Sequence, residues 1–120
     1  MKKMIMLLLL VCIPNIANAY INRPNAVVRI MNKAAGKTQT VRVPVGKNFE
    51  YEKLNVNVRA CKQTDPFEVE NHFMFIEISK NGDGQIFGGW MNRNAPGDNP
   101  LQNADYDLWL VGCEADLTGN

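Results

Sequence analysis

Few side chains in this sequence could take part in covalent catalysis. The chain has one histidine, His72, and one serine, Ser79, so a serine–histidine–carboxylate triad would need both. They lie seven positions apart in a segment that alternates like a strand, which directs the two side chains to opposite faces of a sheet. This separation argues against a triad, and we predict no catalytic residue.

The same scarcity limits metal binding. One histidine and no cluster of ligands leave no zinc or iron site of the usual spacing. The segment from Ser79 to Ile86 resembles a calcium loop only faintly, because Ser79 stands where a carboxylate is needed and Trp90 where a bidentate glutamate is needed. We therefore expect a hairpin turn at Asn81–Gly84, no metal and no other cofactor.

Two other kinds of chemistry stay open as alternatives. A small glycan-acting hydrolase could use Asp98, Asp105 or Asp107, and it would need two carboxylates that face each other in a pocket. A carbohydrate-binding module could instead stack sugar rings on Trp90 and Tyr106, and it would need both aromatic side chains to be exposed.

The first 19 residues have the order of features of a secretory signal peptide. Lys2 and Lys3 precede an apolar run from Met4 to Ile13, and Ala17-Asn18-Ala19 places small residues before a cleavage site. As a helix the apolar run would rise about 15 Å, half of a hydrocarbon core of about 30 Å, so a membrane anchor is a poor interpretation. We predict cleavage after Ala19, export to the periplasm, and no transmembrane segment in the mature chain.

Cleavage would remove Cys12 and leave Cys61 and Cys113. Two cysteines in an exported domain predict one disulfide. Loss of Lys2 and Lys3 would leave 11 of the 13 basic side chains against 12 acidic ones, a net charge of −1. A nearly neutral chain lacks the basic surface of a nucleic-acid-binding protein, so we expect no nucleic-acid partner.

The elements that must position these residues alternate with a period of two, as β-strands do. We see no convincing amphipathic helix. The pattern predicts an all-β fold, a compact antiparallel sandwich or small barrel of six to seven short strands with one disulfide. The candidate strands are residues 26–31, 38–45, 49–52, 54–61, 73–79, 85–91 and 105–111.

Several strand predictions are specific enough to test. Pro44 cannot donate a ladder hydrogen bond, so its strand should lie at a sheet edge. The strand 73–79 is apolar on both faces and should be central. Alternation places Cys61 on the face opposite Val58, and Cys113 on the face opposite Leu110. Gly88-Gly89 predicts a bulge or a close approach of another group to the backbone.

Three stretches between Val41 and Cys113 resemble a known family. The first is Val43-Pro44-Val45-Gly46 with Leu54 and Val58-Arg59-Ala60-Cys61; the second is Phe75-Ile76-Glu77-Ile78; the third is Phe87, Gly89-Trp90-Met91, Asn99-Pro100-Leu101 and Tyr106-Asp107-Leu108-Trp109-Leu110 with Cys113. They resemble the domain of unknown function 2155, a family of small exported proteins of Gram-negative bacteria. The resemblance implies export and a Cys61–Cys113 pair, and it brings no assigned activity. The family tends to have an apolar, serine-rich run after Met91, where this chain has Asn92-Arg93-Asn94-Ala95.

Together these observations predict four parts: a signal peptide (1–19), a lead-in with a first strand (20–40), a β domain (41–113) and a polar tail (114–120). We expect a non-enzymatic periplasmic domain that binds another envelope component, a protein or a glycan. The candidate binding surface is the loop Asn92–Asp105 and its neighbours, because long loops on rigid sheets often carry function. Its residues are Trp90, Met91, Asn92, Arg93, Asp98 and Tyr106.

Overall fold

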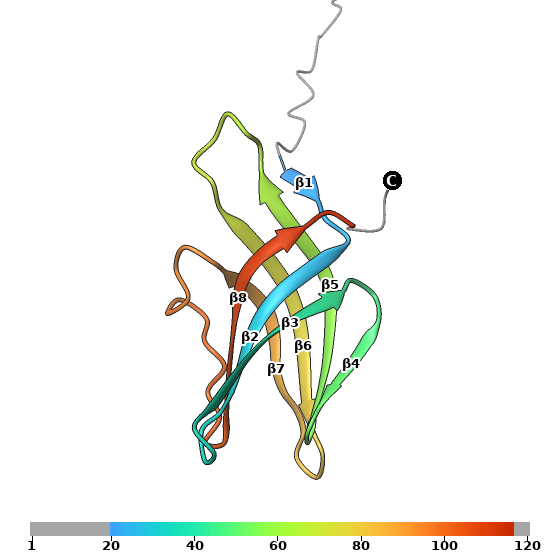
Figure 1. Cartoon of the computed structure of the whole chain (residues 1–120), viewed down its shortest axis with the longest axis vertical. Coiled ribbons are helices and arrows are strands. Elements are labelled where there is room, and N and C mark those ends of the chain that lie inside the picture. The colour runs from blue at the N-terminus through green and yellow to red at the C-terminus, as the bar shows by residue number, and fades with distance from the viewer. Residues whose placement is uncertain (1–19, 117–120) are drawn as a thin grey trace, which may run out of the picture.

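Two antiparallel sheets make up the part of the chain that the computed structural model describes, residues 20–116 (Figure 1). The predicted signal peptide, Cys12 and residues 117–120 of the polar tail lie outside the described residues. The larger sheet has the order β1-β5-β6-β7, with β4 also paired to β5, and the smaller has the order β3-β2-β8. The strands are β1 (Tyr20–Asn22), β2 (Asn25–Asn32), β3 (Lys37–Pro44), β4 (Asn48–Tyr51), β5 (Leu54–Thr64), β6 (His72–Lys80), β7 (Gly84–Asn92) and β8 (Tyr106–Glu114).

Short connections join most consecutive strands, and two of them, β1 to β2 and β3 to β4, pass between the sheets. A long loop makes a further crossing. Hairpins connect β2 to β3, β4 to β5, β5 to β6 and β6 to β7, whereas residues 93–105 carry the chain from β7 to β8, which pairs with β2. The all-β class is confirmed. Residues 20–40 add one strand more than the sequence predicted, because Tyr20–Asn22 pairs with the end of β5. Within residues 20–116 there is no helix long and apolar enough to cross a membrane.

The core lies between the sheets and explains why these segments are strands. Alternate residues of β6 are fully buried, and β6 lies between β5 and β7 as predicted for a central strand. Each buried aliphatic side chain contributes about 1.5–3 kcal/mol relative to an exposed one. The strand that ends at Pro44, β3, lies at an edge, which confirms that prediction. Side chains with 0% exposure include Val28, Ile30, Val56, Val58, Met74, Ile76 and Ile78.

A bulge in β5 makes the predicted orientation of Cys61 wrong. Val58 points into the core, but the register with β6 then shifts between Val58 and Ala60. Arg59 is exposed, Ala60 is half-buried, and Cys61 turns inward with 2% exposure. A bulge places two residues opposite one, so it reverses the phase of the alternation beyond it.

A second bulge does the same in β8. Val27 pairs with Gly112 and Val28 with Leu110, so the register passes over Val111. Cys113 therefore turns to the core, 5% exposed, instead of lying opposite Leu110. The two bulges bring Cys61 and Cys113 together in a disulfide with Cα atoms 5.6 Å apart. The disulfide is confirmed, although alternation alone assigned both cysteines to the wrong face.

Candidate functional site

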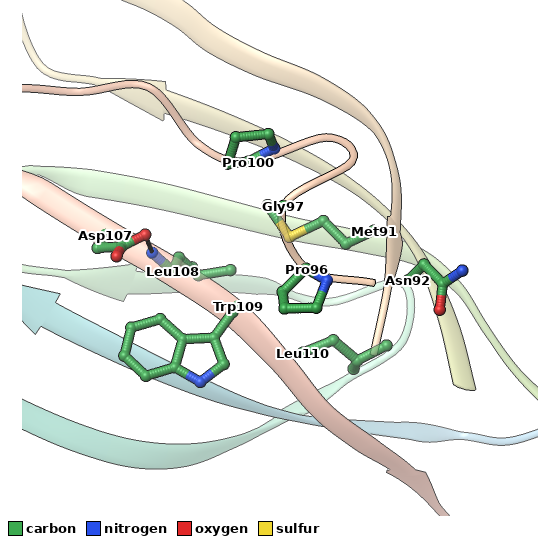
Figure 2. Close-up of a pocket in the computed structure, with 9 residues that line it drawn as sticks. All are labelled: Met91, Asn92, Pro96, Gly97, Pro100, Asp107, Leu108, Trp109 and Leu110. Carbon is green, nitrogen blue, oxygen red and sulfur yellow. Dashed lines mark hydrogen bonds between the residues drawn. The ribbon is translucent and has the colours of Figure 1, made fainter. Parts of the chain in front are cut away.

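The long loop, residues 93–105, covers a hollow of about 380 Å³ between the end of β7 and β8 (Figure 2). Most of the lining side chains are apolar. The carboxylate of Asp107 accepts the backbone N–H of the next residue, Leu108, at 2.9 Å. The lining residues are Met91, Asn92, Pro96, Gly97, Pro100, Asp107, Leu108, Trp109 and Leu110.

Hydrogen bonds and one buried side chain hold this loop against the strands. Asn99 Nδ2 donates to the carbonyl oxygen of Trp90 at 3.0 Å, and Leu101 is 4% exposed. Asn99 approaches so closely that a Cβ at position 89 would lie 3.0 Å from its Nδ2. Both glycines show the close approach that Gly88-Gly89 predicted, because a Cβ at position 88 would lie 2.5 Å from Gln85 Nε2. At Gly89 the neighbour is Asn99 of the long loop. The φ of Gly89, 156°, is also one that a residue with a side chain rarely adopts.

The six residues predicted as a binding surface do not share one surface. Trp90 is 44% exposed on the outer face of the larger sheet, whereas Met91 points inward and is 5% exposed. Consecutive strand residues face opposite ways, so these neighbours cannot serve one partner together. Asn92 lines the hollow, and Arg93 turns to Glu70. Asp98 lies in the loop, where its N–H donates to the carbonyl oxygen of residue 95.

Tyr106 does not join Trp90 in a sugar-stacking platform. Its side chain is 5% exposed, and its hydroxyl donates to Glu52 Oε2 at 3.0 Å. Burial, and then the neighbouring Glu52 carboxylate, raises the pKa of Tyr106, so the phenol stays protonated and keeps donating. The carbohydrate-binding alternative thus loses one of the two exposed aromatic residues that it requires.

Two carboxylates, Glu52 and Asp105, help to line a second hollow of about 360 Å³. Glu52 accepts hydrogen bonds from Asn32 and Tyr106, and it has a φ of 51°, an uncommon conformation for a residue other than glycine. Lys80 donates to Asp105, and this hydrogen bond lowers the pKa of the Asp105 carboxyl.

This geometry does not favour the hydrolase alternative. A carboxyl that acts as a general acid near neutral pH needs a raised pKa, and that of Asp105 is shifted the other way. Glu52 instead links β2 to β8, because its partners Asn32 and Tyr106 lie on those strands. The Asp107 carboxylate accepts the N–H of Leu108 within the same strand.

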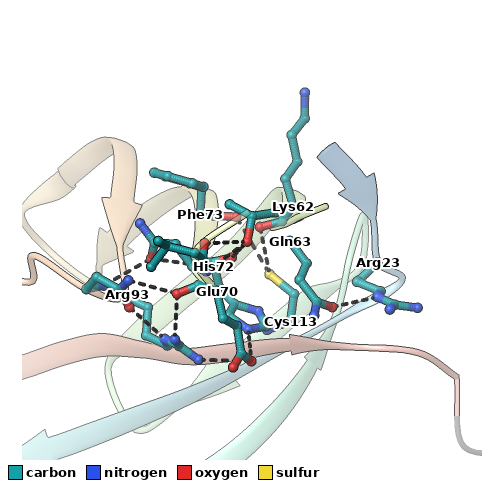
Figure 3. Close-up of polar contacts among 12 residues, drawn as sticks. Arg23, Lys62, Gln63, Glu70, His72, Phe73, Arg93 and Cys113 are labelled. Carbon is teal, nitrogen blue, oxygen red and sulfur yellow. Dashed lines mark hydrogen bonds and ion pairs between the residues drawn. The ribbon is translucent and has the colours of Figure 1, made fainter. Parts of the chain in front are cut away.

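His72 has a structural role next to the disulfide (Figure 3). Its Nδ1 accepts the backbone N–H of Cys113 at 2.8 Å, which places the ring proton on Nε2, 3.2 Å from Glu70 Oε1. Arg93 Nη1 lies 3.5 Å from the same carboxylate oxygen, Oε1. The hydrogen bond from His72, followed by the charge of Arg93, lowers the pKa of Glu70. The single histidine thus joins β8 to the start of β6.

An aromatic row crosses the outer face of the larger sheet, and the sequence interpretation missed it. We define it as Tyr20, Phe73, Phe75 and Trp90. Tyr20 packs edge-to-face on Phe73 with ring centroids 5.7 Å apart, and Phe75 packs on Trp90 at 5.3 Å. Tyr20 and Trp90 are 47% and 44% exposed. The sequence did indicate this row, because the segment Phe73–Ser79 is apolar on both faces. We attributed the second apolar face only to a central position in the sheet.

A shallow hollow of about 200 Å³ lies within this row. Tyr20, Lys62, Phe73 and Trp90 line it, and Lys62 Nζ lies 5.8 Å from the centroid of the Trp90 ring. When one face of an antiparallel sheet packs on a core, the other usually presents polar residues to water. The row departs from that pattern and is the best candidate binding surface on the sheets. Among residues 20–116, no three histidine, cysteine or acidic side chains are grouped to hold a metal ion.

Comparison with known proteins adds a family but no activity. A family model described as an uncharacterized protein conserved in bacteria (DUF2155) matches residues 26–113. The match runs from β2 to Cys113 and so includes strands of both sheets. No curated protein and no solved structure matches the chain.

Proposed function

The chain belongs to the family domain of unknown function 2155, and on that premise we propose that it is an exported, non-enzymatic domain that binds another component of the bacterial cell envelope. Its role is to present a rigid binding surface. The aromatic row is the observation on which the binding proposal rests.

Export is supported by the sequence features of residues 1–19 and by their fit to the fold. Tyr20 is the first residue of β1 and pairs with Thr64, so cleavage after Ala19 would leave every described strand intact. The Cys61–Cys113 disulfide suits the periplasm, because disulfides persist in oxidising compartments and are rare in the cytoplasm.

Binding is supported by the chemistry of the aromatic row. Tyrosine and tryptophan supply a large contact area with few rotatable bonds, and both are enriched at the centre of protein interfaces. Edge-to-face packing on Phe73 and Phe75 fixes the two exposed rings. A partner that covers the row would therefore gain apolar contact with little further loss of side-chain entropy.

The absence of an enzymatic role is supported by how the reactive groups are occupied. His72 is hydrogen-bonded to the backbone of Cys113 and to Glu70, and Asp105 is paired with Lys80. Each of these groups holds strands or loops together. None presents an activated nucleophile or a carboxyl of raised pKa to a pocket.

Export is tested by fractionating Gram-negative cells that express the full chain. We expect the protein in the periplasmic fraction, with Tyr20 at its N-terminus and no free thiol. The control Ala19→Arg should block cleavage, because a large side chain does not fit the −1 position. A full-length protein that stays in the cytoplasm with free thiols would contradict the proposal.

Binding is tested by a photoreactive amino acid placed at position 90 in intact cells. We expect a discrete covalent adduct after irradiation. The matched control carries the same amino acid at Gln39, an exposed position of β3 in the other sheet. Equal adducts at both positions, or none at position 90, would count against the aromatic row as a binding surface.

A further inference from the structure

We propose that the loop between β5 and β6 docks into an apolar pocket ringed by lysine or arginine on a partner protein. We call residues 65–71 the docking loop. Phe67 is 98% exposed and Val69 is 83% exposed, the two highest values among the exposed large hydrophobic residues. Asp65, Glu68 and Glu70 alternate with them and the loop contains no basic residue. This inference rests on the proposed function, since it names the class of the bound component.

The exposure of the two apolar side chains is built into a hydrogen-bonded backbone. Thr64 Oγ1 donates to the carbonyl oxygen of Val69 at 3.0 Å, and it accepts the N–H of Asn71 at 2.9 Å. At the tip, the carboxylate of Asp65 accepts the N–H of Phe67 at 3.0 Å. These bonds close the loop at its base and shape its tip, so the backbone itself directs Phe67 toward solvent.

The base of the docking loop is also fastened to the rest of the domain. Arg93 Nη2 and Asn94 Nδ2 both donate to the carbonyl oxygen of Glu70, at 3.1 and 2.9 Å. The Glu70 side chain meets His72, which in turn holds Cys113 of the disulfide. A loop ordered in this way loses little entropy when it binds, which favours a preformed anchor.

The chemistry of the docking loop specifies its partner. A fully exposed phenylalanine gains most where it fills a pocket, as buried aromatic anchors do at the centre of interfaces. The Asp65 and Glu68 carboxylates beside it favour a positively charged rim, because like charges across an interface are strongly unfavourable, whereas the Glu70 carboxylate is already paired with His72 and Arg93. The same carboxylates would be repelled by anionic phospholipids, so the loop favours a protein over a membrane surface.

The docking loop begins next to one end of the aromatic row, because Tyr20 pairs with Thr64, the residue that precedes the loop. Figure 1 shows the loop at the same end of the larger sheet as β1, which carries Tyr20 of the row. A partner that receives Phe67 in its pocket could therefore rest on Tyr20 at the same time.

The test places a photoreactive phenylalanine analogue at position 67 of the full chain, in the bacterium that carries its gene. We expect one protein adduct, and we expect the partner residues identified by mass spectrometry to be apolar with lysine or arginine beside them. Glu68→Lys in the same chain should reduce the adduct at least fivefold. The matched control Lys37→Glu, an exposed charge reversal on β3, should leave it unchanged.

The Kd of the purified partner then measures how much Phe67 contributes to binding. Phe67→Ser should raise Kd at least tenfold and leave the melting temperature within about 1 °C, because a side chain in water contributes little to folding. Four results would each overturn the inference. Two concern the adduct: it forms with a lipid or glycan, or it is insensitive to Glu68→Lys. The other two are an unchanged Kd for Phe67→Ser and sedimentation of the protein with phosphatidylglycerol vesicles. An adduct at position 90 without one at position 67 would overturn this inference alone, whereas no adduct at either would overturn the proposed function as well.

Discussion

Removal of the disulfide should destabilise this domain strongly. The variant is Cys61→Ala with Cys113→Ala, which avoids leaving a buried hydroxyl or an unpaired thiol in the core. The bond closes a loop with a sequence separation of 52. In the chain-entropy description, opening a loop of that size lowers the free energy of unfolding by about 4 kcal/mol.

The expected change in melting temperature follows from the size of the domain. A chain of about 100 residues gains about 0.2 kcal/mol per kelvin of entropy on unfolding, so a loss of about 4 kcal/mol lowers Tm by about 20 °C. Differential scanning calorimetry of the purified mature chain measures both quantities. The control is the unchanged protein with its bond reduced, which retains both cysteine side chains and should lose a similar amount.

The result that would refute this reasoning is a Tm within about 5 °C of the disulfide-bonded protein, with the bond verified by mass. It would mean that the paired strands restrict the ends of β5 and β8 without the bond. The single variant Cys61→Ser adds a chemical check, because it should lower Tm and leave Cys113 reactive toward thiol reagents.

The polar contacts lead to three further predictions. His72→Ala removes the acceptor of the buried Cys113 N–H and should cost about 1–3 kcal/mol in urea unfolding; an unchanged midpoint would contradict this role. The hydrogen bond from His72, and then the charge of Arg93, lowers the pKa of Glu70, so ionised Glu70 stabilises the native state above pH 4.5 and this contribution is lost as the pH falls. Glu70→Gln should therefore flatten the acid side of a stability–pH curve. An identical curve would contradict the stabilising role of ionised Glu70. Gly89→Ala forces a side chain to adopt φ of 156° beside Asn99 and should cost about 1–3 kcal/mol in thermal unfolding; a neutral result would contradict the close approach.

The predictions that held concern patterns within a single segment. Alternate apolar residues in β6 identified a strand, and its second apolar face identified a central one. Pro44 identified an edge because it lacks an N–H, and Asn81–Gly84 marked the β6–β7 hairpin because glycine tolerates positive φ. These properties depend on a residue and its immediate neighbours, so the sequence displays them directly.

The predictions that failed concern the phase of a strand. Cys61 and Cys113 each lie just beyond a bulge. The residue types at the two bulged positions, Arg59 and Val111, do not indicate a bulge. A bulge is settled by how two strands pair, and for β8 the partner is β2, near the other end of the chain. The cysteines were nevertheless paired correctly, because that prediction used the two that remain after the expected loss of Cys12, and not the face on which each lies.

The candidate site shows the same division. The sequence placed Trp90 and Tyr106 on one surface through their nearness to the long loop, yet one lies on the outer face and the other is buried against Glu52. The docking loop is acidic and contains a proline, a composition typical of any solvated loop. The structure shows that Phe67 is 98% exposed and that its N–H donates to the Asp65 carboxylate.

The sequence by itself determined that this protein is built of strands, because the period of two is a local property of each segment. It also predicted the Cys61–Cys113 disulfide, because these two cysteines lie outside the predicted signal peptide. The tertiary structure decided which side chains share a face, where the bulges turn both cysteines inward, and which aromatic residues remain in contact with water. The reason is that burial depends on which strand pairs with which and on how the two sheets pack, and those contacts join residues far apart in the chain.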